Sequence, residues 1–189
     1  MKNLKFSILA AATILFAASC DKDDPIPVNE EEVITTVIVR LTTAAGATVT
    51  LTSKDIDGDG PGMPVVTQTG TVQKGTNYLG TVSFLNEQKT PADDITAEVK
   101  AEGDEHQVFY MTASTLGTIA YDDLDTNGKP VGLKFKLTTA ATANTTQQNL
   151  AVTLIHKPVK TAVGVVGGNI ANAGGATDAE VTYRVVLAD

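Results

Sequence analysis

Apolar and polar residues alternate one by one along most of the chain after residue 32. Between residues 33 and 41 the odd-numbered positions hold Val, Thr, Val, Val and Leu. Near the C-terminus, Val181, Tyr183, Val185 and Leu187 repeat this pattern, with Thr182 and Arg184 between them. Because successive side chains of a β-strand point to opposite faces, a period of two predicts half-buried strands.

The same alternation predicts strands elsewhere in the chain. It resumes at Val49 and Leu51 and returns at residues 65–67, 78–85, 107–112, 118–121, 131–137 and 150–155. Gly, Asn and Asp clusters between these runs predict turns, including Asn127-Gly128. Residues 95–101 also alternate, and we predict a strand there, although Ile95 and Val99 would equally fit one helical turn. The Gly- and Ala-rich residues 161–177 are predicted to form a long loop or a weak edge segment.

About nine short strands separated by turns predict an all-β fold. We expect an immunoglobulin-like β-sandwich of about 8–9 strands, built by residues 33–189 as one domain. The Cys and Trp positions that mark antibody domains are absent from this sequence.

The first 19 residues have the pattern of a secretory signal. Lys2 and Lys5 precede an apolar run at residues 6–18, and small residues lead to Cys20. This run is shorter than the ~20 residues that a membrane-spanning helix needs. The segment resembles a bacterial lipoprotein lipobox, although Ala17 stands where Leu is commoner. We therefore expect residues 1–19 to be removed and Cys20 to carry the lipid that anchors the protein to a membrane.

Residues 20–32 are expected to form an acidic linker behind that lipid. The linker holds two Pro residues and almost nothing to bury, so it should stay extended. Its residues Lys22, Asp23 and Asp24 resemble the export signal of Bacteroidota surface lipoproteins. That resemblance implies display on the outer face of the outer membrane.

Charge and composition exclude some partners and sites. The chain has 14 basic and 22 acidic side chains, for a net charge of -8. Removing Lys2 and Lys5 with the signal leaves 12 basic against 22 acidic groups, hence -10. Such a surface repels phosphates, so no nucleic-acid partner is expected. The single Cys excludes a disulfide framework within the chain and a zinc site built from cysteines.

The sequence predicts no enzyme. The serines after the signal are Ser53, Ser83 and Ser114, and none lies in a G-x-S-x-G motif. The sequence contains many pairs of carboxylates, and these alone do not exclude a glycosidase. Zero Trp and only nine aromatic residues disfavour a sugar-stacking cleft.

Two aspartate-rich loops are candidate Ca²⁺ sites. Their oxygen-bearing residues are Asp55, Asp57 and Asp59 in the first loop, and Asp123, Asp125 and Asn127 in the second. Alternating carboxylates before a Gly match the first half of a calcium-binding loop, but the acid that would complete it is missing from both. The alternative is that Asp, Asn and Gly simply form turns by bonding to the local backbone.

The two histidines are candidate ligands for a transition metal. His106 is in phase with Val108, and His156 is in phase with Leu154, so each ends an apolar strand face. If the sandwich brings these strand ends together, both imidazoles and Glu105 could hold Zn²⁺, Cu²⁺ or a haem iron. The alternative is that each His only makes hydrogen bonds at its strand end. The cofactor is thus unknown, with Ca²⁺ and a transition metal as the two candidates.

Several segments together resemble a family of small Bacteroidota lipoproteins encoded near TonB-dependent outer-membrane receptors. The segments are residues 57–60, 83–87, 104–107, 127–133, 154–158 and 174–178. Members of this family are sometimes labelled as having a type 1 periplasmic-binding fold, which the period-two pattern does not support. Ala176 stands where Glu is commoner in such chains, which weakens a role for its loop as an acidic site.

The resemblance implies a surface accessory to uptake. We expect a non-enzymatic binding module for TonB-dependent transport of a metal or a metal complex, with the receptor as its partner. The alternative is a structural or adhesive surface module with no small ligand.

Overall fold

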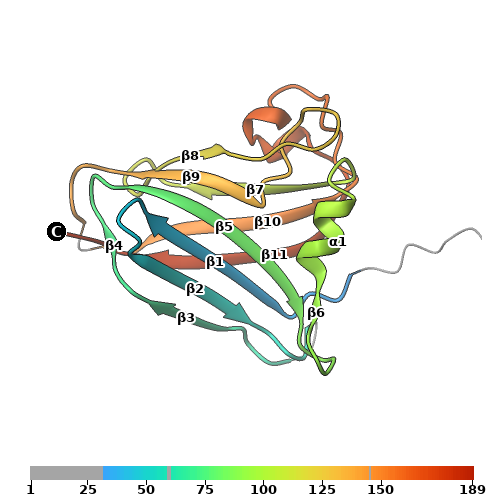
Figure 1. Ribbon diagram of the computed structural model, residues 1–189, viewed down its shortest axis with the longest axis horizontal. Helices are drawn as coiled ribbons and strands as arrows, with labels where there is room; N and C mark the ends of the chain where they lie inside the picture. Colours follow the sequence, from blue (N-terminus) through green and yellow to red (C-terminus); the bar gives the residue numbers. More distant parts are fainter. Residues whose placement is uncertain (1–31, 59–60, 145) are drawn as a thin grey trace, which may run out of the picture. The chain divides into compact units, whose positions relative to one another are not determined.

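The computed structural model describes residues 32–58, 61–144 and 146–189 (Figure 1). The predicted signal, Cys20 and the residues Lys22, Asp23 and Asp24 lie outside these ranges, and so does Asp59. Residues 31–189 form one compact unit. Among the residues described, no helix has the length and apolar character needed to cross a membrane.

The fold is built from strands, with one short α-helix and two 3₁₀ turns. The elements are β1 (Thr36–Thr43), β2 (Thr48–Lys54), β3 (Val65–Thr69), β4 (Val72–Gln73), β5 (Asn77–Asn86), β6 (Asp93–Asp94), α1 (Ile95–Ala101), β7 (His106–Thr112), β8 (Gly117–Tyr121), β9 (Lys134–Thr139), β10 (Gln148–His156), η1 (Val165–Gly167), η2 (Ile170–Asn172), β11 (Ala176–Val185) and β12 (Leu187–Ala188). The described chain thus has nine strands of five or more residues, which confirms the all-β prediction.

The strands form two facing sheets and one small pair. The larger sheet has the order β3-β2-β1-β5-β9-β8, with β6 paired to β5. The second sheet has the order β11-β10-β7, and β12 pairs with β4. All pairings within the two sheets are antiparallel, as alternating one-sided burial predicts. Figure 1 shows the two sheets face to face, so the architecture is that of a β-sandwich.

The core lies between the two sheets. Val39 and Leu41 of β1 and Leu150 and Leu154 of β10 are fully buried in the same cluster. The hydroxyl of Tyr183 on β11 donates a 2.8 Å hydrogen bond to the carbonyl oxygen of Val37 on β1 and so joins the sheets. A second, smaller cluster around Phe109, Ile155 and Val165 fills the space between the second sheet and the 3₁₀ turns.

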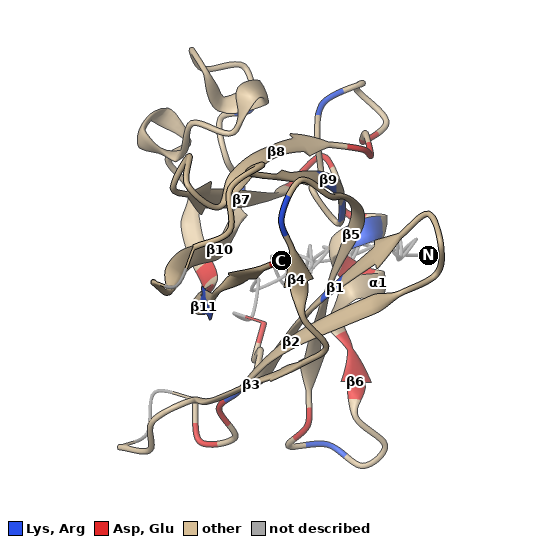
Figure 2. Ribbon diagram, turned by 90° about the vertical axis from the view of Figure 1, so that its left-hand side faces the viewer, with Lys and Arg blue, Asp and Glu red and all other residues tan. Residues whose placement is uncertain are grey.

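The prediction of a strand at residues 95–101 is wrong, because this segment is the helix α1. Asp94, at the end of the acidic strand β6 (Figure 2), caps the helix by accepting from the Thr96 N–H. Ile95 and Val99 are buried, and their spacing of four residues places them on one helical face. Ile95 and Val99 satisfy both periods, so these two large apolar residues could not choose between strand and helix.

The segment predicted as a long loop is largely one. Residues 161–175 contain the two 3₁₀ turns, and β11 begins at Ala176. Gly164 and Gly168 flank η1 with φ angles of 85° and 88°, a conformation that side chains beyond glycine rarely adopt.

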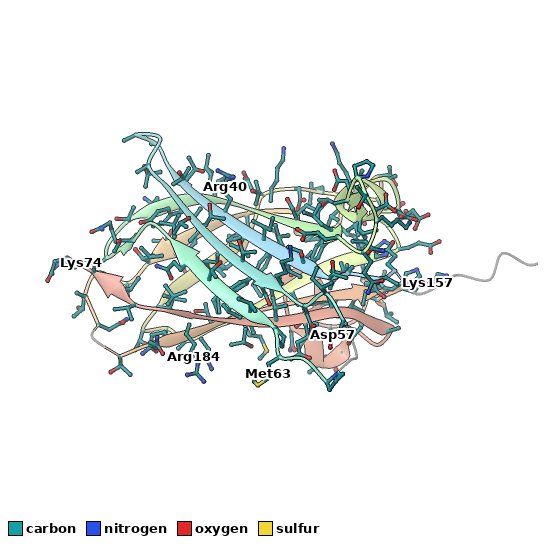
Figure 3. All side chains as sticks on the ribbon, turned by 90° about the horizontal axis from the view of Figure 1, so that it is seen from below. Arg40, Asp57, Met63, Lys74, Lys157 and Arg184 are labelled. Carbon is teal, nitrogen blue, oxygen red and sulfur yellow. The ribbon has the colours of Figure 1, made fainter. Side chains whose placement is uncertain are left out.

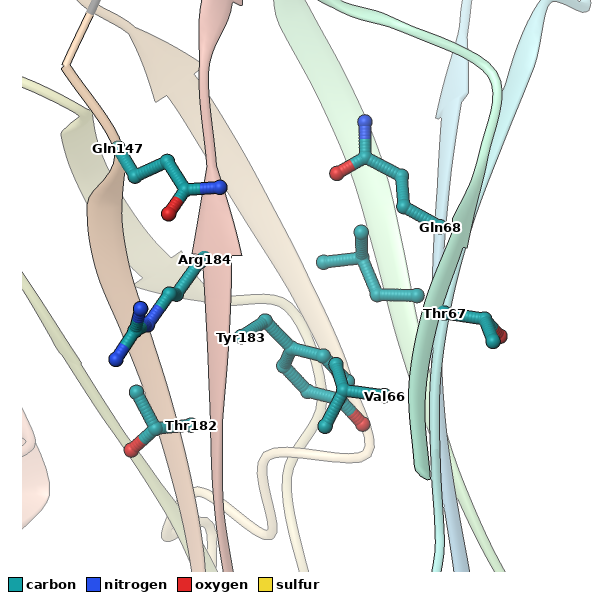
Figure 4. Close-up of a pocket in the computed structure, with 8 residues that line it drawn as sticks. Val66, Thr67, Gln68, Gln147, Thr182, Tyr183 and Arg184 are labelled. Atoms are coloured by element: carbon teal, nitrogen blue, oxygen red, sulfur yellow. The ribbon is translucent and has the colours of Figure 1, made fainter. Parts of the chain in front are cut away.

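The sandwich is open along one edge. The five residues of β3 are all exposed, although Val66 pairs with Ser53 and Gln68 with Leu51 on the core-facing side of β2. The second sheet ends at β11 and leaves a cavity of about 290 Å³ there. Val66 and Tyr183 point into this space from opposite sides (Figure 4).

Gly80 provides a stability test of the core. It pairs with Phe135 across β5 and β9, and a Cβ added there would overlap the Phe135 ring. Phe135 is fully buried, and its ring centroid lies 4.3 Å from that of Tyr110, so it has little freedom to move. We therefore expect Gly80→Ala to lower the free energy of unfolding by about 1–3 kcal/mol in urea titrations, as overpacking does.

Gly167→Ala is the matched control. A Cβ at Gly167 meets nothing within 4 Å, so this variant should unfold like the wild type. Equal stability of Gly80→Ala and the wild type would show that the Phe135 ring has room to shift.

Candidate histidine-acid site

The two histidines lie side by side, which meets the condition on which a shared site depends. His106 begins β7 and His156 ends β10, and the antiparallel register pairs them directly. Their ring centroids are 4.7 Å apart, and their planes differ by 7°. Both residues are buried, and His106 is fully so. Two strands whose facing core residues fix the register therefore place two imidazoles in contact at their ends.

The tautomer of His106 follows from its hydrogen bond. Its Nδ1 lies 3.1 Å from the backbone oxygen of Glu102, which can only accept, so Nδ1 carries the proton. In the neutral ring the lone pair is then on Nε2, which has no hydrogen-bond partner among the described residues. In a metal-binding histidine, the ring nitrogen that does not bind the metal usually donates a hydrogen bond to an oxygen such as a backbone carbonyl. This bond fixes the orientation of the ring.

Buried carboxylates face the free nitrogen of His106. The Oε1 atom of Glu32 is 3.7 Å from Nε2, and the Oδ2 atom of Asp178 is 3.8 Å away. The two acids are only 13% and 5% exposed. These separations exceed a hydrogen bond and leave space between donor atoms.

The potential ligands form two overlapping groups. One consists of His106, His156 and Asp178, and the other of Glu32, Glu102 and His106. Within each group, one donor atom per residue lies within 4.8 Å of the others. These are the only such groups of His, Cys, Asp and Glu in the described ranges, and both include His106.

Negative charge is concentrated at this cluster. Burial, followed by the charges of Glu98, Asp178 and Glu102, raises the pKa of Glu32 to about 7. Burial is the larger cause of this shift, and the neighbouring carboxylates add to it. A cation bound beside Glu32 would favour its ionised form.

The sequence identified the histidines but missed most of the acids. The predicted ligand Glu105 is half exposed, 3.5 Å from Nε2 of His156 and 3.5 Å from the ammonium group of Lys157 (labelled in Figure 3). It belongs to neither group of clustered donors. Glu32 was assigned to the linker, and Asp178 comes from β11. Only the fold shows that they meet His106, because both are far from it in sequence.

In the first aspartate loop, the Asp57 carboxylate is engaged by the backbone of the turn. Asp57, in the loop after β2 (Figure 3), accepts a 2.9 Å hydrogen bond from the Gly62 N–H. This bond and one with Asp55 lower the pKa of Asp57. The geometry favours the alternative that the loop is a turn; its Ca²⁺ binding stays a prediction because Asp59 lies outside the described ranges.

The second aspartate loop is organised by hydrogen bonds as well. Asp123 accepts from the backbone N–H groups of Gly132 and Lys134, at 2.7 and 3.0 Å. Asp125 accepts from the N–H groups of Asn127 and Lys129, at 2.8 and 2.9 Å. Asn127 thus contributes its backbone rather than a side-chain oxygen. This arrangement also favours turn formation over Ca²⁺ binding.

A buried lysine contacts this loop at Asp125, one of its predicted Ca²⁺ ligands. The ammonium group of Lys160 donates to the Asp125 Oδ2 and Pro130 oxygen atoms, both at 2.9 Å, and to the Gly103 oxygen. Lys160 and Asp125 are 5% and 1% exposed. Burial raises the pKa of Asp125, but hydrogen bonds from Lys160 and from backbone N–H groups outweigh it and lower that pKa overall. Sequence patterns gave no sign of this ion pair.

The chain matches no protein-family model, no curated protein and no solved structure. The cluster is therefore interpreted from its own geometry.

Replacing Asp125 should be costly. Asp125→Asn leaves the Lys160 ammonium buried without a countercharge, so we expect a loss of about 3–5 kcal/mol in urea unfolding at pH 7. Because the pKa of Asp125 is lowered by folding, its contribution is present above the ordinary pKa of Asp. It should disappear as pH falls below that value.

Asp122→Asn is the control, because Asp122 makes an exposed ion pair with Lys136. Such surface pairs contribute about 0–1 kcal/mol. If both variants lost the same stability, the buried pair would have no special role.

Glu32 should make stability depend on pH in the opposite sense. Its pKa is about 7 in the folded chain, against an ordinary value of 4.5, so the folded state binds this proton more tightly. The resulting stability is present at low pH and is lost as pH rises through about 7. In chelator, Glu32→Gln should therefore gain stability relative to the wild type as pH rises over this interval. Parallel pH profiles for the two proteins would contradict this.

Proposed function

We propose that the protein is a non-enzymatic binding module that holds a divalent transition-metal ion between His106, His156 and Asp178. The observation that supports it best is the buried pair of stacked imidazoles, with the Nε2 atom of His106 facing carboxylates. Glu32 approaches the same nitrogen and is the fourth ligand in this proposal.

The donor types favour a transition metal over Ca²⁺. Calcium takes six to eight oxygen ligands, whereas imidazole nitrogens suit zinc, copper, nickel and iron. Two nitrogens and two carboxylate oxygens match a tetrahedral Zn²⁺ site. A divalent ion would also offset the charge that raises the pKa of Glu32.

The cluster must contract to hold the ion. The donor atoms of each group lie within 4.8 Å of one another. The donors of a tetrahedral Zn²⁺ ion, at about 2.0–2.1 Å from the metal, would be roughly 3.3 Å apart. The two parallel rings must therefore tilt so that their lone pairs converge. Rotations about side-chain bonds can supply movements of this size while the strand pairing of His106 and His156 stays in place.

The ligand set favours retention of the ion over catalysis. A structural zinc site fills its four positions with protein ligands, while a catalytic one leaves a position for water or substrate. Four protein donors with little exposure match the first case. We therefore propose capture or storage of the ion, and no reaction.

The proposed setting is the bacterial surface. A lipid on Cys20 would anchor the module, and Lys22, Asp23 and Asp24 would direct it to the outer face of the outer membrane. There it would collect the ion and pass it to a TonB-dependent receptor. The alternative is a structural or adhesive module with no small ligand, which the open edge at β3 would suit.

Zinc titration of the unlipidated mature chain, residues 20–189, tests the site. Competition with a chromophoric chelator should show one bound Zn²⁺ per chain. We expect His106→Ala or His156→Ala to weaken binding more than about 100-fold, because removing a ligand should exceed the 10–100-fold effect of an outer-shell change. Asp178→Asn should weaken it as well.

Glu180→Gln is the matched control, because Glu180 is exposed on β11 two residues beyond Asp178. It should bind like the wild type. Absence of Zn²⁺ binding by the wild type would favour the structural or adhesive alternative. Loss of binding in Asp55→Ala with Asp57→Ala, but not in the histidine variants, would place the metal at the first aspartate loop.

A further inference from the structure

A cavity of about 470 Å³ lies on the other side of α1 from the histidine cluster. It is bounded by α1, by β5, by the loop before β9 and by the start of β9. Thr96 and Lys100, one helical turn apart, face it, whereas Glu98 and Glu102 lie on the side of Glu32 and His106. Its volume is within the range of ligand pockets.

The cavity forms where two neighbouring strands separate. β5 and β9 pair as far as Thr81 and Lys134, after which β5 continues without β9 toward α1 and keeps β1 as its partner on the other side. The helix takes over as the partner of β5, because the Thr96 hydroxyl accepts from the Phe84 N–H. On the other side, the Asp123 carboxylate holds the start of β9. The gap between α1 and the start of β9 is therefore set by hydrogen bonds from backbone N–H groups of the fold.

The floor of the cavity is apolar. Val82, Val131 and Leu133 are buried core residues that line it. Leu124, from the loop before β9, also lines the cavity and is 65% exposed. A large apolar side chain exposed beside a cavity with an apolar floor offers surface that an apolar ligand would cover.

Two lysines in the lining form no ion pair with a described acid. The described chain has nine lysines, and six of them form ion pairs. The remaining three are Lys100, Lys129 and Lys134, and two of these line the cavity. In a chain of net charge -8, two unpaired ammonium groups at one cavity are unexpected.

The acids nearby do not neutralise these lysines. Asp123 and Asp125 line the cavity, but their oxygens accept from backbone N–H groups and from Lys160. Asp104, at the exposed rim, makes no ion pair among the described residues. Lys100 and Lys134 are therefore available to an anion.

We propose that this cavity binds a small organic anion that carries a carboxylate on an apolar body. Lys100 and Lys134 would hold the carboxylate. Val82, Val131, Leu133 and Leu124 would cover the apolar body. This site is separate from the proposed metal site and does not depend on it.

Octanoate is the probe, in a titration of the unlipidated mature chain followed by calorimetry and by amide chemical shifts. Octanoate should bind at one site and shift the amides of α1 and β9. Octanamide, its neutral isostere, and acetate, which lacks the apolar body, should each bind more than about 10-fold more weakly. No binding of octanoate, or equal binding of octanamide, would overturn the proposal.

Lys100→Gln with Lys134→Gln should weaken octanoate binding more than about 10-fold. Lys129→Gln is the matched control, because it removes an equally unpaired lysine outside the cavity and should leave affinity unchanged. Equal affinity of the double variant and the wild type would also overturn the proposal. His106→Ala should bind octanoate normally, which separates this site from the metal site.

Discussion

The register between β7 and β10 determines what the buried end of this sandwich can do. Val108 pairs with Leu154 and His106 with His156, and the apolar pair lies in the main core. A slip of one residue would turn every side chain of one strand to the opposite face. The cost of exposing the core therefore fixes the histidine pair, although stacking of two imidazoles contributes little by itself. The chemistry at the strand ends follows from packing in the strand middles.

The protein handles its two buried charge clusters in opposite ways. At Asp125 the fold supplies a cation, Lys160, and the carboxyl pKa falls. At Glu32 the surrounding groups include Glu98, Glu102 and Asp178, and the pKa rises to about 7. In the first cluster the charge of Lys160 balances that of Asp125, and the pair stabilises the loops that it joins. The second gathers carboxylates around Nε2 of His106, and this arrangement is the physical basis for proposing a metal ion there.

Local patterns predicted the strands well and the site only in part. Alternation identified β1, β2 and β5 because each buries one face, and the shared phase of His106 with Val108 placed that histidine on the core side. The alternation of Leu150, Val152 and Leu154 also identified β10, although its C-terminal half is buried on both faces. Nothing local could show that Glu32 and Asp178 face His106, since these contacts depend on how β1 and β11 pack. The aspartate loops illustrate the converse: their spacing resembles calcium ligands, while the carboxylates of Asp57, Asp123 and Asp125 accept from backbone N–H groups that no spacing reveals.

The nature of α1 matters more for function than its seven residues suggest. If residues 95–101 were a strand, the side chains of Thr96, Glu98, Lys100 and the following Glu102 would all share one face. A helix instead turns by about 100° per residue, so Glu98 and Glu102 separate from Thr96 and Lys100. The acids can then face the histidines while the lysine faces the cavity beside β5. One short helix thus keeps an acidic cluster suited to a cation apart from a lysine-lined cavity suited to an anion.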